Sequence, residues 1–408
     1  MTQTPVSVVI VSRHRPEALK LCLTAVARLS YSNYEIVVVA DPAGLRALEE
    51  LPFASRIKAV AFDEANISAA RNRGIAQAAG QILAFLDDDA VPEPRWLDHL
   101  TGVFADPSVA AAGGHVLGRN GISVQWSGRV VACTGEASNV SLHRQNPTIL
   151  TAPQGNGVKT EGTNMAVRRE VLAQMGGFDP AFRFYLDETD VNMRLTLLGL
   201  STAFVPLAVV HHGYAASANR RSDRAVRDLH QIAASTVVFL RKHCPASRHD
   251  GVLAQALVEQ RKRILSQMVV GLQEPRDVRR LLRSWADGLE EGRTRPLTDP
   301  LPLPPPQTSF LPFPSLFWGE RVVISGYRAE ASRLRQQATQ AAAEGRLVSL
   351  FLMSRSALYH RVRFHPDGYW EQSGGLWGRG DRSDPLFRPW TLARRVAHEV
   401  RRIGAARF

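Results

Sequence analysis

Short apolar segments alternate with helical segments through the first half of the chain, and this alternation restricts the fold more than any other feature. VSVVIVS (6–12), EIVVVAD (35–41) and QILAFL (81–86) are rich in β-branched or apolar residues and too short for typical helices. Between them, the segments that begin at Pro16 and Ile67 predict helices. Strands that are apolar throughout and alternate with helices predict an α/β fold, with a mostly parallel sheet flanked by helices.

Three adjacent carboxylates, Asp87, Asp88 and Asp89, directly follow the apolar run ILAFL. Ligands of such sheets bind at the carboxyl ends of the strands, so these acids can project into a cleft instead of being buried unpaired. In an extended chain Asp87 and Asp89 point to the same side. Carboxylates are the ligands that Mg²⁺ and Mn²⁺ prefer. A solvated acidic turn is the alternative, and the position at a strand end favours the metal site.

A second group of motifs lies between residues 162 and 214. TNMAVRR predicts a strand leading into a short helix, and LDETDVNMRLTLLG predicts an amphipathic helix with acids in its first turn. VPLAVVHHGY (205–214) predicts a further strand that carries His211 and His212 near its end. Acids in a first helical turn also stabilise the helix without any catalytic role, and one of the two histidines can be structural.

The motifs occur in a fixed order: VSVVIVSRHRP, EIVVVAD, ISAARNRGIAQAAGQILAFLDDDAVPEPRWL, GTNMAVRREVL, GGFD, DETDVNMRL and VPLAVVHH. Together, over about residues 6–243, they resemble the family-two glycosyltransferases of GT-A fold. The resemblance implies a metal-dependent, inverting hexosyl- or deoxyhexosyltransferase of the bacterial surface-polysaccharide type. Such an enzyme moves a sugar from a nucleotide-diphosphate sugar to a hydroxyl of a glycan or lipid-linked acceptor, with Mg²⁺ or Mn²⁺ as cofactor.

The resemblance also implies roles for single residues. Glu188 stands where the family places its catalytic base, usually an Asp, and Asp187 is a rival for that role. Asp41 stands where the family commonly carries two acids, and this chain has Ala40-Asp41. The residues expected to bind the donor nucleotide are Asp41, Asp63, Arg71, Asn72, Asp87 and Asp88.

The expected metal ligands come from the acidic triplet and from the histidine pair, and a further set is expected on the acceptor side. The metal ligands are Asp87, Asp89, His211 and His212. The acceptor-side residues are Asn164, Asp179 and Asp190.

The pattern changes beyond about Pro245, and we expect three domains. Residues 1–245 are expected to form the catalytic domain, 246–315 a helical segment and a Pro-rich connector or strap, and 316–408 a small α/β unit. The small unit is expected to contain a β-α-β segment, a hairpin and a basic C-terminal helix. That helix carries an apolar stripe, which either lies on an anionic membrane or packs on the protein itself: Leu392, Val396, Val400 and Ile403.

The formal charge is 50 − 38 = +12, which suits nucleic acid, an anionic membrane surface or an acidic substrate. No nucleic-acid-binding motif is present, so we expect no nucleic-acid partner, although a basic nucleic-acid-binding protein remains an alternative. A second alternative is a nucleotidyltransferase that acts on sugar phosphates. Such an enzyme requires a Gly-rich loop after the first strand, and the segment there, SRHRPEA, contains no Gly. Three dispersed Cys and no membrane-spanning apolar run predict a cytoplasmic protein, with peripheral contact at the inner face of the cell membrane as one reading.

Overall fold

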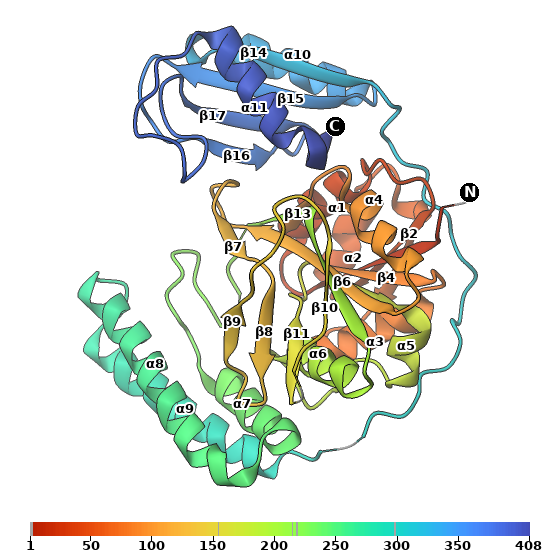
Figure 1. Cartoon of the computed structure of the whole chain (residues 1–408), viewed down its shortest axis with the longest axis vertical. Coiled ribbons are helices and arrows are strands. Elements are labelled where there is room, and N and C mark those ends of the chain that lie inside the picture. The colour runs from red at the N-terminus through yellow and green to blue at the C-terminus, as the bar shows by residue number, and fades with distance from the viewer. Residues whose placement is uncertain (1–2, 154, 214, 218, 298) are drawn as a thin grey trace.

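The computed structural model describes residues 3–153, 155–213, 215–217, 219–297 and 299–408. Tyr214, the last residue of the expected strand 205–214, and Thr298, in the Pro-rich segment, lie outside the described residues. Figure 1 shows a large α/β body, a pair of long helices beside it, and a small α/β unit at the C-terminal end.

The large body is built on a ten-stranded sheet with the strand order β10-β13-β6-β12-β4-β1-β2-β3, to which β5 and β7 add at the side. Six strands run in one direction, because β12 is antiparallel to both of its neighbours while β13 is parallel to β6. The mostly parallel sheet predicted from the sequence is therefore confirmed. The strands are β1 (Val6–Ser12), β2 (Tyr34–Ala40), β3 (Ile57–Ala61), β4 (Ile82–Asp87), β5 (Ala90–Pro92), β6 (Val109–Leu117), β7 (Val124–Trp126), β10 (Thr148–Leu150), β12 (Met165–Arg168) and β13 (Ser201–His212).

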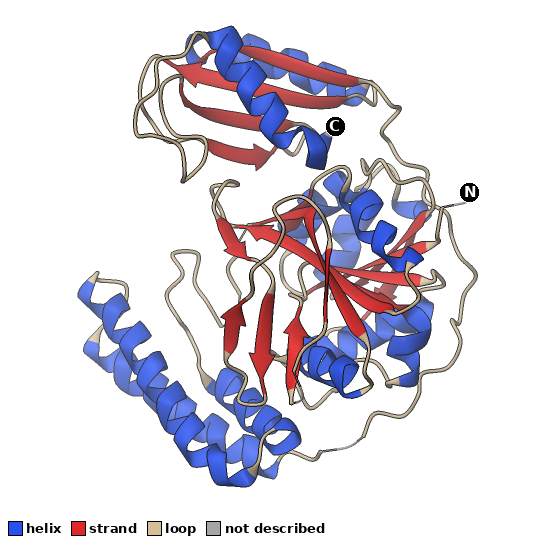
Figure 2. Ribbon diagram, viewed as in Figure 1, coloured by secondary structure: helices blue, strands red, loops and turns tan. Residues whose placement is uncertain are grey.

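Helices cover both faces of this sheet (Figure 2). Alternation along each strand divides the core: on β2, Ile36 and Val38 pack on one face with α1, whereas Val37 packs on the other with α3. The central strands β1, β2 and β4 are therefore buried on both faces, as a sheet covered by helices on two sides requires. The helices of the body are α1 (Pro16–Val26), α2 (Pro42–Glu49), α3 (Ile67–Gln77), α4 (Trp96–Gly102), α5 (Arg169–Gln174) and α6 (Asp187–Leu197).

The sequence did not predict a small three-stranded sheet, β11-β8-β9, beside α6. Its strands are β8 (Arg129–Ala132), β9 (Ala137–Asn139) and β11 (Asn156–Lys159). They are three or four residues long and partly polar, so they carry little hydrophobic periodicity.

Three helices follow the body: α7 (His230–His243), α8 (His249–Val269) and α9 (Pro275–Thr294). Helices α7 and α9 pack closely because α9 carries glycines at the contact. A Cβ added to Gly288 would lie 2.2 Å from the carbonyl oxygen of His230. Beyond α9 the Pro-rich segment runs along the body as a strap (Figure 1), held where Phe313 donates its backbone N–H to Tyr34.

The C-terminal unit is a four-stranded sheet of order β14-β15-β17-β16. Strands β14 (Arg321–Tyr327) and β15 (Leu347–Ser354) are parallel and joined by α10 (Ala331–Ala343), whereas β16 (Arg361–Phe364) and β17 (Trp370–Gly375) form an antiparallel pair. The β-α-β segment and the hairpin expected from the sequence are both confirmed.

The C-terminal helix, α11 (Leu392–Arg407), packs its apolar stripe on the sheet of this unit. Val396 is buried against Phe351 and Met353 of β15, and the rest of the stripe packs on the same cluster. Of the two alternatives for the stripe, packing on the protein itself is therefore the one that the structure shows. In the described parts of the chain no helix has both the length and the apolar character needed to cross a membrane.

Candidate active site

A cavity of about 490 Å³ opens where the parallel strands end. Ser12 and Arg15 reach it from the end of β1, Phe62 from the end of β3, and Asp87 from the end of β4. Phe184, from the loop before α6, closes another side. The cavity lies at the sheet edge where the sequence predicted ligand binding.

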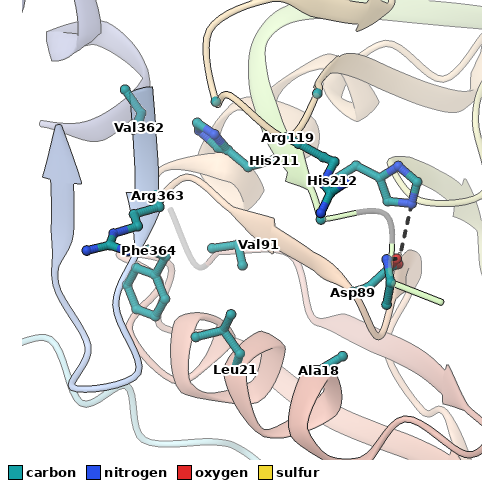
Figure 3. Close-up of a pocket in the computed structure, with 14 residues that line it drawn as sticks. Ala18, Leu21, Asp89, Val91, Arg119, His211, His212, Val362, Arg363 and Phe364 are labelled. Carbon is teal, nitrogen blue, oxygen red and sulfur yellow. Dashed lines mark hydrogen bonds and ion pairs between the residues drawn. The ribbon is translucent and has the colours of Figure 1, made fainter. Parts of the chain in front are cut away.

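Two acids of the triplet and one histidine converge beside this cavity. Asp87, Asp89 and His212 each place one ligand atom within 4.8 Å of the others, and we call them the acidic cluster. His212 Nε2 lies 3.3 Å from Asp89 Oδ1 (Figure 3), and the backbone N–H of Ala215 donates to Asp89 Oδ2 at 2.7 Å. Burial raises the pKa of Asp89, but His212, Arg15 and the Ala215 amide together lower it below the usual range. Two carboxylates and an imidazole fit a divalent cation.

The middle acid of the triplet has different surroundings. Asp88 is fully buried, accepts a hydrogen bond from Ser12 Oγ at 2.7 Å and pairs with Arg15 at 2.8 Å. Burial raises the pKa of Asp88 to about 7, although Arg15 opposes that shift. Asp88 does not line the cavity, and its ion pair holds Arg15, which does.

The other expected nucleotide-binding acids lie at the ends of β2 and β3. Asp41 is buried, caps α2 through the N–H of Gly44 at 3.1 Å and lies 3.0 Å from His14 Nδ1. Asp63 is exposed and pairs with Arg13 at 2.9 Å. The basic partners Arg13 and His14 line the cavity, and the two acids do not.

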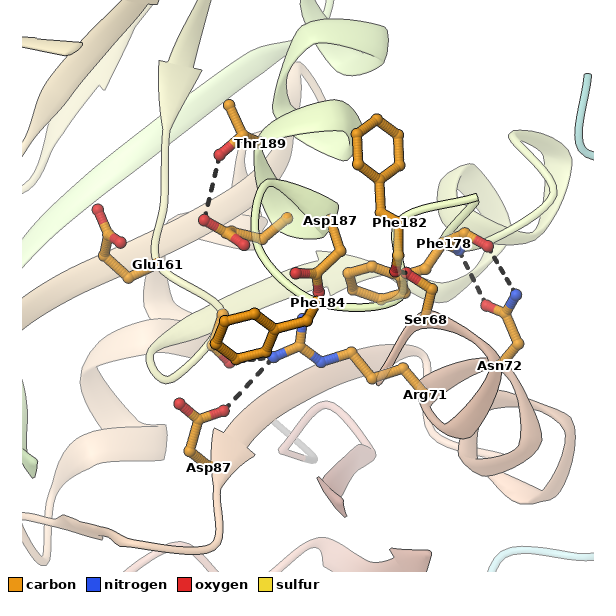
Figure 4. Close-up of polar contacts among 12 residues, drawn as sticks. Ser68, Arg71, Asn72, Asp87, Glu161, Phe178, Phe182, Phe184, Asp187 and Thr189 are labelled. Carbon is orange, nitrogen blue, oxygen red and sulfur yellow. Dashed lines mark hydrogen bonds and ion pairs between the residues drawn. The ribbon is translucent and has the colours of Figure 1, made fainter. Parts of the chain in front are cut away.

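Arg71 joins the acidic cluster to the acids of α6. Its guanidinium contacts Asp187 and lies 3.4 Å from Asp87 Oδ1 (Figure 4). The neighbouring Asn72 both donates to and accepts from the backbone of Phe178, at 2.7 and 2.9 Å, and so holds the GGFD segment against α3. Arg71 is therefore placed to act electrostatically, whereas Asn72 positions the backbone.

Glu188 and Asp187 share the first turn of α6 and have separate cationic partners. Lys159 Nζ donates to Glu188 Oε1 at 2.8 Å and to the hydroxyl of Thr189 at 2.7 Å. Burial raises the pKa of Glu188, but Lys159 outweighs it and lowers the pKa to about 2. Burial raises the pKa of Asp187, and Arg71 opposes this. Glu188 is thus an ionised carboxylate at neutral pH.

The two histidines at the end of β13 point to different neighbours. His212 belongs to the acidic cluster, whereas His211 Nε2 lies 2.8 Å from Glu93 Oε1 and its ring contacts Trp370 of the C-terminal unit. His211 therefore belongs to the contact between the two units, and only His212 can reach a metal held by Asp87 and Asp89.

The residues expected on the acceptor side are all fully buried. Asn164 donates to the carbonyl oxygens of His115 and Ala208 and accepts from the Trp96 indole at 2.8 Å. Asp179 and Asp190 both pair with Lys242, and Asp190 also pairs with Arg194 and His243. Their burial leaves them no surface with which to contact an acceptor, and we assign them structural roles.

Ser12, Arg15 and Lys159 are site residues that the sequence reasoning missed. Ser12 and Arg15 stand where the first strand ends, at the same sheet edge as the acidic triplet, and that position could have identified them. Lys159 lies on the unpredicted strand β11, and no sequence signal placed it beside Glu188.

Comparison with known proteins supplies the family. Residues 4–231 match the model described as glycosyltransferase like family 2. The O-antigen biosynthesis protein RfbC of Myxococcus xanthus is 29% identical over 231 residues, which cover 53% of this chain and 18% of that protein. Glycosyltransferase AglE of Haloferax volcanii is 35% identical over 122 residues, 27% of this chain and 39% of that protein. The chain thus spans less than half the length of these relatives. A crystal structure of GalNAc-T7 with UDP, GalNAc and Mn²⁺ superposes with a TM-score of 0.46 at 17% identity, covering 59% of this chain and 48% of that chain.

Proposed function

The chain belongs to glycosyltransferase family 2, whose model matches more than half of it, and we propose that it is an inverting transferase that uses a nucleotide-diphosphate sugar. The observation that carries the proposal is the acidic cluster at the edge of the strand-end cavity. The sugar is proposed to be a hexosyl or deoxyhexosyl group, and the acceptor a hydroxyl of a glycan or glycolipid.

The donor is proposed to occupy the 490 Å³ cavity, with its diphosphate toward the acidic cluster. Asp87, Asp89 and His212 would hold Mg²⁺ or Mn²⁺, which when bound stabilises charge on the leaving diphosphate without proton transfer. Arg13 and Arg15 add positive charge to the same cavity, which His14 also lines, and Arg15 pairs with Asp89 of the acidic cluster at 3.3 Å. Asp41 orients His14 and Asp63 orients Arg13, so both acids act on the nucleotide through their basic partners.

Glu188 is proposed as the base that takes the proton from the acceptor hydroxyl. Lys159 keeps it ionised and fixes Oε1. Lys159 and Thr189 both contact Oε1, and the side chain remains 16% exposed, so Oε2 is proposed to face the acceptor. Attack by that hydroxyl opposite the leaving diphosphate inverts the anomeric centre, by the stereochemical logic that inverting hydrolases follow. Asp187 is committed to Arg71 and is the weaker candidate.

Contact with an anionic membrane, at the cytoplasmic face, is proposed to be made by exposed loops of the C-terminal unit rather than by α11. These loops carry large exposed apolar side chains close to arginines, with Arg379 over the Tyr359 ring. The apolar side chains are Leu358, Tyr359, Leu386 and Phe387. Interfacial segments often combine apolar and basic residues in this way.

A thermal-shift screen of UDP-, GDP- and dTDP-sugars, each with and without Mn²⁺, tests the donor and the metal together. A ligand that binds only the native state raises the apparent stability, and we expect one nucleotide to do so more strongly with metal. Sugar transfer by that donor to a glycan or lipid-linked acceptor is then measured directly. If no nucleotide sugar shifts the transition under any condition, the proposed function is wrong.

A further inference from the structure

A second cavity, of about 740 Å³, lies between the large body and the C-terminal unit. The body contributes the β6–β7 loop, the first residues of β7 and Arg224, and the C-terminal unit contributes β16 and Arg382. Half of its ten lining residues are arginines, and none of the described lining residues is acidic. We call it the arginine cleft, after Arg119, Arg224, Arg361, Arg363 and Arg382.

The guanidinium groups of the cleft are accessible, and the acid beside Arg363 is shared with another cation. All five side chains belong to exposed residues. Arg363 Nη2 donates to Glu371 at 2.7 Å, but Glu371 also binds Arg335, so one carboxylate is shared by two cations. Arg382 Nε donates to the hydroxyl of Ser123 at 3.1 Å. Like charges gathered around one cavity repel one another, and a bound anion relieves that repulsion.

The arginine cleft is joined to the acidic cluster by a smaller cavity. This cavity, of about 220 Å³, shares Gly118, Arg119 and Arg363 with the cleft and extends to Asp89 and His212. Figure 3 shows Arg363 and Phe364 projecting from β16 on one side of it, with Asp89 and His212 on the other. A ligand anchored in the cleft can therefore extend toward the acidic cluster.

Both walls of the cleft are fixed where the two units meet. The backbone N–H of Val362 in β16 donates to the carbonyl oxygen of Asn120 in the β6–β7 loop at 2.8 Å. Gly121 has φ +67°, and a Cβ there would lie 2.2 Å from the carbonyl oxygen of Val362, so only glycine permits this approach. The C-terminal unit supplies three of the five arginines, so the cleft exists only because that unit is docked.

We propose that the arginine cleft binds a phosphate or diphosphate group of the acceptor. The planar guanidinium, with its fork of N–H donors, matches phosphate oxygens and remains charged at any physiological pH. The donor diphosphate is proposed to lie at the acidic cluster, so we assign the cleft to a second phosphate-bearing molecule. Naming that molecule as the acceptor rests on the proposed function, whereas the anion site itself does not. Either a lipid-linked phosphate or a soluble phosphorylated glycan supplies this chemistry.

The direct test is calorimetric titration of the full chain with inorganic diphosphate in EDTA, which removes any binding through a divalent metal. Arg119→Glu/Arg361→Glu alters one residue on each wall. Arg394→Glu/Arg401→Glu makes the same charge change on exposed positions of α11 outside the cleft and serves as the matched control. The cleft variant loses two sets of charged hydrogen-bond donors, so it is expected to bind diphosphate at least about tenfold more weakly than the control.

Equal weakening in both variants, or binding that neither variant changes, would overturn the proposal, provided that both retain the wild-type melting temperature. If the cleft variant unfolds, Arg119→Gln/Arg361→Gln replaces it in the same titration.

Two further measurements are needed. One identifies the molecule that carries the phosphate, and the other asks whether the anion site holds when the proposed function does not. Sedimentation with phosphatidylcholine vesicles that contain a polyprenyl phosphate is expected to depend on the cleft if the acceptor is lipid-linked. Diphosphate binding without such sedimentation supports a soluble phosphorylated acceptor. Diphosphate binding by a chain that binds no nucleotide sugar would leave the anion site standing and remove the proposed function.

Discussion

Three adjacent aspartates acquire different surroundings because the chain turns immediately after β4. Asp87 ends the strand with its side chain 31% exposed, Asp88 turns inward to Ser12 and Arg15, and Asp89 faces His212. Adjacent residues of the same type can therefore have different roles. Substitutions at single positions of the triplet should have distinct effects.

Asp89→Asn should remove most metal affinity and most transferase activity while the fold persists. The substitution keeps the size of the side chain and a hydrogen-bond acceptor but removes the charge shared between His212 and Arg15. Loss of one ligand of a divalent cation is expected to weaken binding by about tenfold or more, by comparison with the 10–100-fold effect of outer-shell changes. Mn²⁺ binding, followed by electron paramagnetic resonance, measures this directly, and near wild-type turnover at excess Mn²⁺ would contradict the assignment.

Glu188→Gln should leave donor binding intact and lower turnover by about 10²-fold or more, the usual contribution of general base catalysis. The change is nearly isosteric and keeps an oxygen for the Lys159 ammonium. Asp187→Asn is the control, because Asp187 is held by Arg71. If only the Asp187 variant loses turnover, the catalytic role belongs to Asp187.

The pH dependence of turnover should reveal the effect of Lys159 on the pKa of Glu188. With the pKa of Glu188 lowered to about 2, the base is deprotonated throughout the range above pH 4 and imposes no acid limb there. Lys159→Met removes the cation that lowers the pKa and leaves the burial that raises it, so an acid limb should appear at higher pH. A kcat profile that is unchanged in this variant would show that Lys159 does not control the base.

At the scale of elements, the sequence predicted the apolar, β-branched strands of the central sheet best, and it missed strands without that composition, such as β6 and β11. β1 was predicted with its observed bounds, Val6–Ser12. β6 reads VAAAGGHVL, and its Ala and Gly residues lack β propensity, so its place beside β13 depends on tertiary packing. β11 is four residues long and partly polar, and Lys159 was missed with it.

The sequence likewise predicted only part of the candidate site. Acids at strand ends could be identified, because position in a parallel sheet predicts exposure to a cleft. The burial of an acid by partners that are distant in the sequence could not be predicted. Asp190, for example, is held by Lys242 and His243, which lie about fifty residues downstream on α7. His211 and His212 were equivalent in the sequence, and the docked C-terminal unit distinguishes them through Trp370.

The end of α11 holds the C-terminal unit on the body through one buried ion pair. Arg407 donates to both carboxylate oxygens of Glu93, at 2.8 and 2.6 Å, and lies over the Trp370 ring. Burial raises the pKa of Glu93, but Arg407 and His211 lower it to about 2. A carboxyl group whose pKa is lower in the folded than in the unfolded protein stabilises the fold at pH values above its unfolded pKa. The contribution of Glu93 is therefore complete above about pH 4.5 and is lost as the pH falls toward 2.

Arg407→Met should therefore lower the free energy of unfolding by about 3–5 kcal/mol, because it leaves Glu93 buried and unpaired. Arg401→Met, at an exposed position of the same helix, should change it by less than about 0.5 kcal/mol. Urea denaturation followed by tryptophan fluorescence measures both variants. Equal stability of the two would mean that the pair does not hold the units together.

At the scale of the whole molecule, the Pro-rich strap connects α9 to the C-terminal unit along the outside of the body (Figure 1). Its residues make specific contacts with the body: Leu311 donates its N–H to the buried carboxylate of Glu35 at 2.8 Å, and Ser315 Oγ donates to Leu29. Phe313 is buried between Tyr34 and Phe53, with both ring centroids at 5.5 Å. The strap is thus part of the core of the body rather than a free linker.

Phe313→Ala should consequently destabilise the body by about 3–5 kcal/mol, the usual cost of truncating a buried phenylalanine. The vacated space lies in the cluster that packs α1 and α4 on the central sheet, so the loss falls on the body and not on the C-terminal unit. Leu301→Ala is the matched control, because Leu301 belongs to the same strap and is 83% exposed. Differential scanning calorimetry of both variants measures the effect, and equal melting temperatures would show that the strap contributes nothing to the stability of the body.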